Sequence, residues 1–130
     1  MIVIDASTVL EVLLRSQVGL EIEKRIFSPQ EILFTPHLLD LEIAQVLRRY
    51  CMAGEINSER GEEALEDLKD LPINRYPHDI FLHRVWELRH NMTAYDAVYV
   101  ALAEALSAPL LTRDARLASA PGHEAIIELI

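Results

Sequence analysis

The chain has 130 residues, of which 51% are hydrophobic and 25% are charged, and its formal net charge is −9. This length and composition predict one globular domain over residues 1–130, and they exclude a disordered, fibrous or bilayer-spanning chain. The excess of acidic residues argues against a simple basic surface for nucleic acid. It suits a protein that holds cations or binds a basic partner.

The cysteine count and the first residues indicate the compartment that we expect. Cys51 is the only cysteine, so no intrachain disulfide can form. The opening run MIVIDASTV lacks the positive region and the cleavage site of a signal peptide. We therefore expect a cytoplasmic protein with no membrane association.

Strand and helix patterns alternate along the whole chain. In chain order we expect a strand at 2–4, helices at 7–15 and 19–27, a strand at 32–34, helices at 35–52 and 58–70, a strand at 73–76, helices at 78–89 and 93–106, and strands at 110–112 and 126–129. This alternation predicts an α/β domain with a mainly parallel central sheet.

Three of these helices carry more detailed expectations. Thr35 and Pro36 are predicted to be the N-cap and first-turn proline of their helix. The Glu-rich helix at 58–70 has a thin apolar stripe that includes Leu65 and Leu68. In the helix at 78–89 we expect an inward apolar face. That face consists of Ile80, Phe81, Val85, Trp86 and Leu88.

Two predicted strands lead into an aspartate, Asp5 after IVI and Asp114 after LLTR. In an open parallel sheet the ligand site lies beyond the carboxyl ends of the strands, so both would lie at that edge. Each aspartate alone is well explained as the cap of the following helix. Two of them at the same edge favour a functional site.

A third carboxylate, Asp96, lies in the apolar stretch MTAYDAVYVALA. Thr93 and Asp96 fit the capping-box spacing, and an acid in the first turn complements the helix dipole. Asp96 is therefore explicable without catalysis. A carboxylate that caps a helix still has lone pairs for a second role.

A fourth carboxylate comes from the helix at 35–52. Glu42 has mostly apolar neighbours at helical spacing, so it faces a core and needs a partner, for which Arg49 is the ordinary structural candidate. Asp40 is a rival for the same role. Periodicity does not choose between them, because this helix is apolar most of the way round.

Four converging carboxylates with little basic compensation would repel one another, and a hard divalent cation would resolve that conflict. Oxygen ligands suit Mg²⁺ or Mn²⁺, whereas the five scattered histidines show no zinc-type spacing. A haloacid-dehalogenase-type phosphatase also has an aspartate after its first strand. It needs a second aspartate two residues later, where this chain has Ser7.

Four segments in order, IVIDASTVLE, LLDLEIAQVLRRY, YDAVYVALAE and PLLTRDARLA, resemble the PIN-domain ribonucleases, specifically VapC-type toxins of toxin–antitoxin pairs. The resemblance covers nearly the whole chain. It implies a three-layer α/β/α fold. It also implies an Mg²⁺- or Mn²⁺-binding quartet, and it selects Glu42 over Asp40. The implied quartet is Asp5, Glu42, Asp96 and Asp114.

The resemblance also assigns supporting residues. Ser7 and Thr112 look like the hydroxyls that support the site, and Asn91 and Tyr95 fall beside it. Many relatives carry another acid shortly after the fourth aspartate, and Ala115 to Leu117 provide none here. This departure weakens the case for a second metal ion.

The implied activity is metal-dependent cleavage of structured RNA, such as tRNA or rRNA, which inhibits translation and growth. The implied partners are a VapB-type antitoxin and a second copy of the chain. The Glu-rich helix is either a solvated face or part of the clamp for these partners. The arginines available for RNA phosphates are Arg15, Arg48, Arg49, Arg113 and Arg116. The alternative is a catalytically silent PIN-like scaffold that binds RNA or protein.

Overall fold

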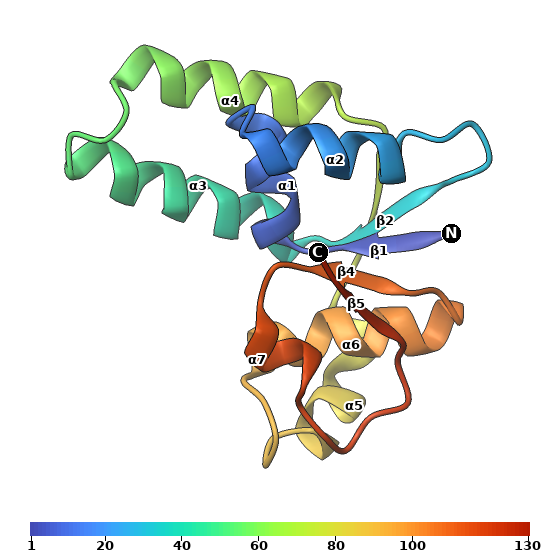
Figure 1. The fold of residues 1–130 in the computed structure, drawn as a ribbon. Helices are drawn as coiled ribbons and strands as arrows, with labels where there is room; N and C mark the ends of the chain where they lie inside the picture. Colours follow the sequence, from blue (N-terminus) through green and yellow to red (C-terminus); the bar gives the residue numbers. More distant parts are fainter.

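The computed structural model describes all 130 residues, and a five-stranded sheet forms its centre (Figure 1). The strands are β1 (Ile2–Ile4), β2 (Leu33–Pro36), β3 (Ile73–Tyr76), β4 (Leu110–Thr112) and β5 (Ile127–Leu129). Their order is β3-β2-β1-β4-β5, and every neighbouring pair is parallel. The expected parallel sheet is confirmed, without an antiparallel strand.

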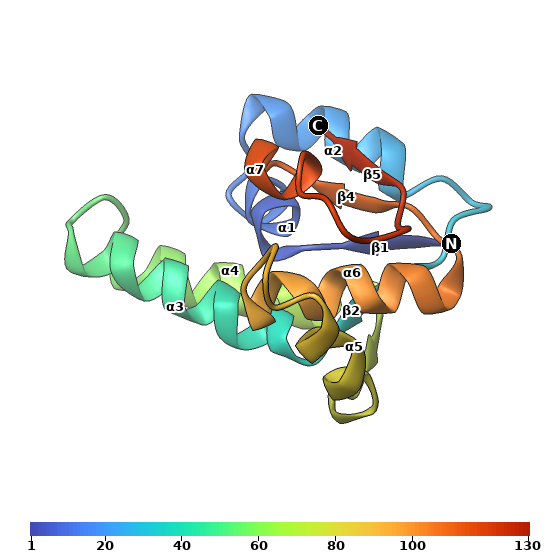
Figure 2. The same ribbon diagram turned by 90° about the horizontal axis from the view of Figure 1, so that it is seen from below.

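Helices cover both faces of this sheet. They are α1 (Ala6–Leu13), α2 (Gln17–Ile26), α3 (Leu38–Met52), α4 (Ser58–Asp70), α5 (Leu82–Glu87), α6 (Ala94–Leu106) and α7 (Ala115–Ala118), with a 3₁₀ turn, η1, at Asp79–Phe81. Figure 1 shows α1 and α2 on one face and α5 and α6 on the other. Helices α3 and α4 pair and project from the body in both views (Figures 1 and 2). The predicted three-layer α/β/α fold is confirmed.

The core explains why these segments form these elements. Ile2, Val3 and Ile4 are fully buried, because β1 is the central strand and both of its faces are covered. On α6, all seven residues from Ala97 to Ala103 are buried between the sheet and α5. This stretch of the helix is apolar on all sides because it lies inside the molecule. None of the helices is long and apolar enough to cross a membrane.

The predicted start of the third helix is wrong. Thr35 and Pro36 belong to β2, and α3 begins at Leu38 without a side-chain cap. β2 pairs with β3 as far as Pro36, and the His37 N–H continues the pairing by donating to the Tyr76 carbonyl at 2.8 Å. The buried Thr35 hydroxyl donates to the Ile4 carbonyl at 3.1 Å instead of capping a helix. Strand pairing thus prevailed over the local capping signal.

Two predicted apolar faces are narrower than expected. In the segment that begins with η1, Phe81, Val85 and Leu88 are buried, whereas Ile80 and Trp86 are 63% and 66% exposed. A stripe at i, i+4 and i+7 suffices to cover α6, and the neighbouring positions are turned about 100° away. In α4 the buried residues are Ala64 and Leu68, and Leu65 faces outward for the same reason.

An ion pair between α5 and α6 predicts a pH-dependent stability. Arg84 donates to both carboxylate oxygens of Glu104 at 2.8 Å, and the Glu124 N–H donates to Glu104 at 2.9 Å. The Arg84 hydrogen bond lowers the pKa of Glu104 below its ordinary 4.5, although burial opposes this. The stabilisation is therefore present above the ordinary pKa and is lost as the pH falls through the lowered value.

We expect Glu104→Gln to lower the free energy of unfolding at pH 7 by about 1–2 kcal/mol, because charge-assisted hydrogen bonds are lost from a partly buried pair. Urea unfolding across pH measures this, and the deficit should shrink in acid. Glu66→Gln is the control, because Glu66 and Lys69 form a pair that is 72% exposed on both sides. An equal deficit for Glu104→Gln at every pH would contradict the assigned cause.

Candidate active site at the carboxyl edge of the sheet

The order in which the chain adds strands to the sheet reverses between β1 and β4. From β1 the chain passes through α1 and α2 to β2 on one side, whereas it reaches β4 on the other side from α6, which covers the opposite face (Figure 1). Ligand sites of open α/β sheets lie at such a switch point, beyond the carboxyl ends of the strands. Asp5 follows β1 directly and Asp114 follows β4 after one residue, so both lie at this position.

Asp5 is buried and held by three donors. Its Oδ1 accepts from the Ser7 hydroxyl at 2.7 Å and from the Thr8 N–H at 3.0 Å, which makes Asp5 the N-cap of α1. Its Oδ2 accepts from the Thr112 hydroxyl at 2.5 Å. The capping role and a site role therefore coexist in one carboxylate, which these bonds fix in orientation.

Two hydroxyls join the ends of β1 and β4. Thr112 Oγ1 donates to Asp5 and accepts from the Asp114 N–H at 3.0 Å. Ser7 Oγ donates to Asp5 and accepts from the Arg113 N–H at 2.9 Å. Asp114 in turn caps α7 by accepting from the N–H groups of Arg116 and Leu117. The hydroxyl pair therefore sets the position of Asp5 relative to Asp114.

Glu42 reaches the same edge from α3. Its Oε1 accepts from the hydroxyl of Tyr99, a buried residue of α6, at 2.5 Å. Asp40 takes a different direction, because both of its oxygens accept from Arg75 on β3 at 2.7 and 2.9 Å. Glu42 forms no ion pair with Arg49. The hydrogen-bond partners therefore distinguish Glu42 from Asp40, which the periodicity of the helix did not.

Asp96 lies in the first turn of α6, where the Thr93 hydroxyl accepts from the Asp96 N–H at 3.1 Å. Burial raises the pKa of Asp96, and the charges of Asp114 and Asp5 raise it further, against the opposing effect of Arg116. Burial also raises the pKa of Glu42, against the Tyr99 hydrogen bond, and Asp5 and Asp96 add to the increase. The pKa values of Glu42 and Asp96 are therefore raised both by burial and by neighbouring carboxylates.

This donor set fits a hard divalent cation, because its members are carboxylate oxygens with no counter-charge except Arg116, 3.6 Å from Asp114. No group of three or more His, Cys, Asp or Glu side chains is placed to hold a metal ion in this structure. The metal site therefore stays a prediction. Its physical basis is the burial of Glu42 and Asp96 beside other carboxylates, because burial first and the neighbouring charges second raise both pKa values.

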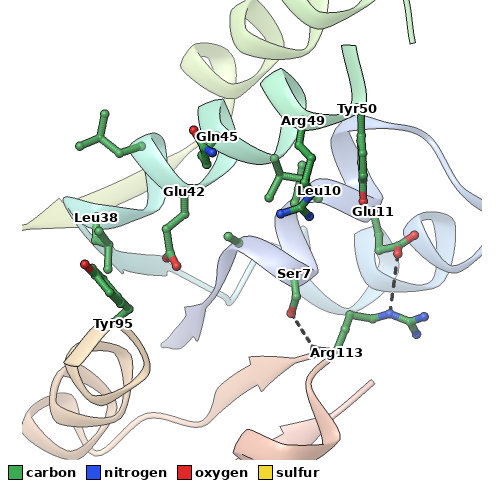
Figure 3. Close-up of a pocket in the computed structure, with 13 residues that line it drawn as sticks. Ser7, Leu10, Glu11, Leu38, Glu42, Gln45, Arg49, Tyr50, Tyr95 and Arg113 are labelled. Carbon is green, nitrogen blue, oxygen red and sulfur yellow. Dashed lines mark hydrogen bonds and ion pairs between the residues drawn. The ribbon is translucent and has the colours of Figure 1, made fainter. Parts of the chain in front are cut away.

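A cleft of about 820 Å³ opens between α1 and α3, and Glu42 is the one member of the predicted quartet that lines it (Figure 3). Ser7 and Glu42 point into it, and Tyr95 from α6 and Arg113 after β4 stand at its wall. Arg49 of α3 also lines it. The other residue predicted beside the site, Asn91, lies with Asp96 in a second and smaller pocket.

The predicted phosphate-binding arginines divide into two groups. Arg49 and Arg113 line the cleft, and Arg116 lies near Asp114. Arg15 is engaged by acids of α4, Glu63 and Asp67, each at 3.6 Å. Arg48 is exposed and lines neither the cleft nor the second pocket.

Tyr99 is the site neighbour that the sequence reasoning missed. A signal was present, because Tyr99 follows Asp96 by three residues and therefore shares a face of α6 with it. The sequence does not reveal that its hydrogen-bond partner is Glu42, which is 57 residues away along the chain. The buried hydroxyl needed a partner, and Glu42 supplies it.

A sequence model described as the PIN domain matches residues 2–122. The chain belongs to the PIN-domain family. This PIN domain is 43% identical over 129 residues to Ribonuclease VapC1 of Mycobacterium tuberculosis, covering 98% of this chain and 96% of that protein. It is 36% identical to Ribonuclease VapC12 of the same organism, covering 100% and 99%. The expected membership in the VapC group of PIN-domain ribonucleases is confirmed.

A solved structure shows the same fold at low identity. VapBC2 from Rickettsia felis, bound to a DNA fragment from their promoter, matches this PIN domain with a TM-score of 0.74 and 12% identity. The match covers 100% of this chain and 99% of that chain. At this identity the likeness concerns the fold alone.

Proposed function

We propose that this VapC-group PIN domain is a divalent-metal-dependent endoribonuclease toxin that cleaves structured RNA, such as tRNA or rRNA. The observation that supports this most is the electrostatic coupling of carboxylates at the switch point of the sheet. Besides burial, the charges of Asp5 and Asp96 raise the pKa of Glu42. Asp5 and Asp114 likewise add to the increase that burial causes in the pKa of Asp96. The relatives named as ribonucleases supply the reaction class.

In this proposal the carboxylates of Asp5, Glu42, Asp96 and Asp114 hold Mg²⁺ or Mn²⁺. When bound, the ion would activate a water molecule and stabilise negative charge on the scissile phosphate. Because ligand sets of this kind work only when their orientation is fixed, the surrounding hydrogen bonds matter as much as the ligands.

The chain's own residues provide that orientation. Ser7 and Thr112 hold Asp5 at both oxygens, and Tyr99 holds one oxygen of Glu42 while its other oxygen remains available. Arg49 and Arg113 at the cleft wall present guanidinium groups that suit RNA phosphates. The cleft would therefore orient the RNA backbone toward the carboxylates while the protein as a whole stays acidic.

The partners in this proposal are a VapB-type antitoxin and a second copy of the chain. The solved relatives include the toxin–antitoxin assemblies VapBC2 and FitAB. The projecting α3 and α4 pair offers surface for such contacts, because only Ala64 and Leu68 of α4 are buried and most of its acidic residues are exposed. A basic segment of an antitoxin would complement these acidic residues.

The first test of the function is cleavage of total RNA by the purified chain with Mg²⁺ or Mn²⁺. We expect discrete fragments, complete loss of cleavage in EDTA, and recovery when the ion is restored. Cleavage that persists in EDTA would contradict metal dependence. Absence of cleavage with every ion would favour the silent scaffold that binds RNA or protein.

A further inference from the structure

Three basic side chains of this acidic protein have no acidic partner. Of twelve Lys and Arg residues, Arg48, Arg49 and Arg89 form no ion pair, although the chain has 21 acidic residues. Arg48 lines neither the cleft nor the second pocket, whereas Arg49 lines the cleft and Arg89 lines the second pocket. One unpaired arginine therefore lines the cleft, together with Glu42, and another lines the second pocket, together with Asp96.

The second pocket has a volume of about 390 Å³ and lies where the turn before α6 meets α7. Its polar lining includes Arg89, Asn91, Arg116 and Thr93, together with Asp96 of the proposed metal site. The pocket therefore adjoins the proposed metal site at Asp96. It is also the place where cationic and amide donors gather beside the site.

Arg89 is held in place without a carboxylate. Its guanidinium carbon lies 4.6 Å from the centre of the Trp86 ring, and its Nη1 donates to the Trp86 carbonyl at 2.9 Å. The remaining N–H groups have no partner within the chain. An arginine oriented by stacking, with donors left free, suits bidentate recognition of a phosphate.

Arg116 and Asn91 complete the lining. Arg116 is 82% exposed at its side chain, and its only acidic contact is Asp114 at 3.6 Å. Asn91 lies against Gly122, which has φ +90°, and a Cβ at Gly122 would come within 2.1 Å of Asn91 Nδ2. Glycine therefore lets the loop after α7 approach Asn91 closely.

We propose that this pocket binds a backbone phosphate of a nucleotide that flanks the bond being cleaved. The inference rests on the proposed ribonuclease function and deepens it. The RNA would cross the carboxylate edge from the cleft, where Arg49 lies, to the pocket of Arg89 and Arg116. A phosphate carries no sequence information, so this contact positions the RNA and does not select the base.

The test compares Arg89→Gln with the control Arg48→Gln, which removes an unpaired arginine that lines neither the cleft nor the second pocket. Binding of a short fluorescein-labelled single-stranded RNA is measured by anisotropy in EDTA, where no cleavage occurs. We expect Arg89→Gln to weaken binding about fivefold to tenfold and to reduce the salt slope by about 0.7, as for the loss of one phosphate contact. Arg48→Gln should bind as the wild type does.

Two further readouts separate this inference from the function on which it rests. Trp86 is the only tryptophan, so RNA should change its emission in the wild type and less in Arg89→Gln. In Mg²⁺, KM should rise for Arg89→Gln with kcat nearly unchanged, because the contact is made equally in the ground and transition states.

Equal binding by Arg89→Gln and Arg48→Gln, or no RNA binding by the wild type, would overturn the phosphate pocket. Normal cleavage with an unchanged KM in Arg89→Gln would overturn the pocket and leave the ribonuclease function intact. If the wild type binds RNA through Arg89 but cleaves none with any ion, the proposed function fails, and the pocket remains only as a phosphate-binding site without its place beside a cleaved bond.

Discussion

Asp5→Asn should abolish RNA cleavage while leaving the fold intact, with a loss of at least about a hundredfold in kcat/KM. Substitutions in the groups that only support metal ligands cost about 10–100-fold, so loss of a buried central ligand should cost more. Asparagine is as good an N-cap as aspartate, so the Thr8 N–H keeps its acceptor. The amide brings no charge to the ion, which is the property under test.

The matched control is Asp40→Asn. Like Asp5, Asp40 is an aspartate at the start of a helix, in this case α3. Its oxygens, however, accept from Arg75, and it lies outside the cleft. Its variant should lose some stability and retain cleavage. Initial rates on total RNA with Mg²⁺, together with growth of cells that express each variant, measure the contrast. Equal loss in both variants, or cleavage by Asp5→Asn at the wild-type rate, would refute the assignment of Asp5.

The sequence predicts the fold well because its signals are local. Short apolar runs between amphipathic segments identify the strands, and their alternation with helices determines a parallel sheet. The local signal fails where a long-range contact competes with it. At Thr35 and Pro36 the capping signal is genuine, but pairing with β3, about 40 positions later in the chain, extends the strand through both residues.

The same limit applies to the site. Asp5 and Asp114 could be placed together from the topology of parallel strands alone. The choice between Glu42 and Asp40 depends on Arg75 and Tyr99, which are 35 and 57 residues away from their partners. No periodicity within α3 contains that information. The family resemblance selected Glu42, which stays a prediction; the geometry shows that Asp40 is occupied by Arg75 whereas Glu42 bonds to Tyr99.

Asp96→Asn should have opposite effects on stability and on metal binding. Burial and the charges of Asp114 and Asp5 raise the pKa of Asp96, so its ionised form at neutral pH destabilises the metal-free fold. Asparagine removes that charge, and the cap remains because Thr93 accepts from the backbone N–H of residue 96. We expect Tm of the metal-free protein to rise by about 2–5 °C at pH 7.

This gain should shrink as the pH falls, because the wild-type carboxylate becomes protonated below its raised pKa and no longer repels its neighbours. With Mg²⁺ or Mn²⁺ the order should reverse. An ion at a hundred times its dissociation constant stabilises the fold that binds it by about 2.7 kcal/mol, and the variant forfeits most of this together with RNA cleavage. Thermal unfolding with EDTA and with each ion, at two pH values, measures both effects.

A variant that is less stable than the wild type without metal would show that Asp96 is a structural cap, as its capping-box position first suggested. Equal stabilisation of both proteins by the ion would place the metal elsewhere. Higher stability without metal combined with weaker stabilisation by metal is the result that a purely structural carboxylate cannot give. It would mean that folding tolerates the repulsion among these carboxylates because the bound ion offsets it.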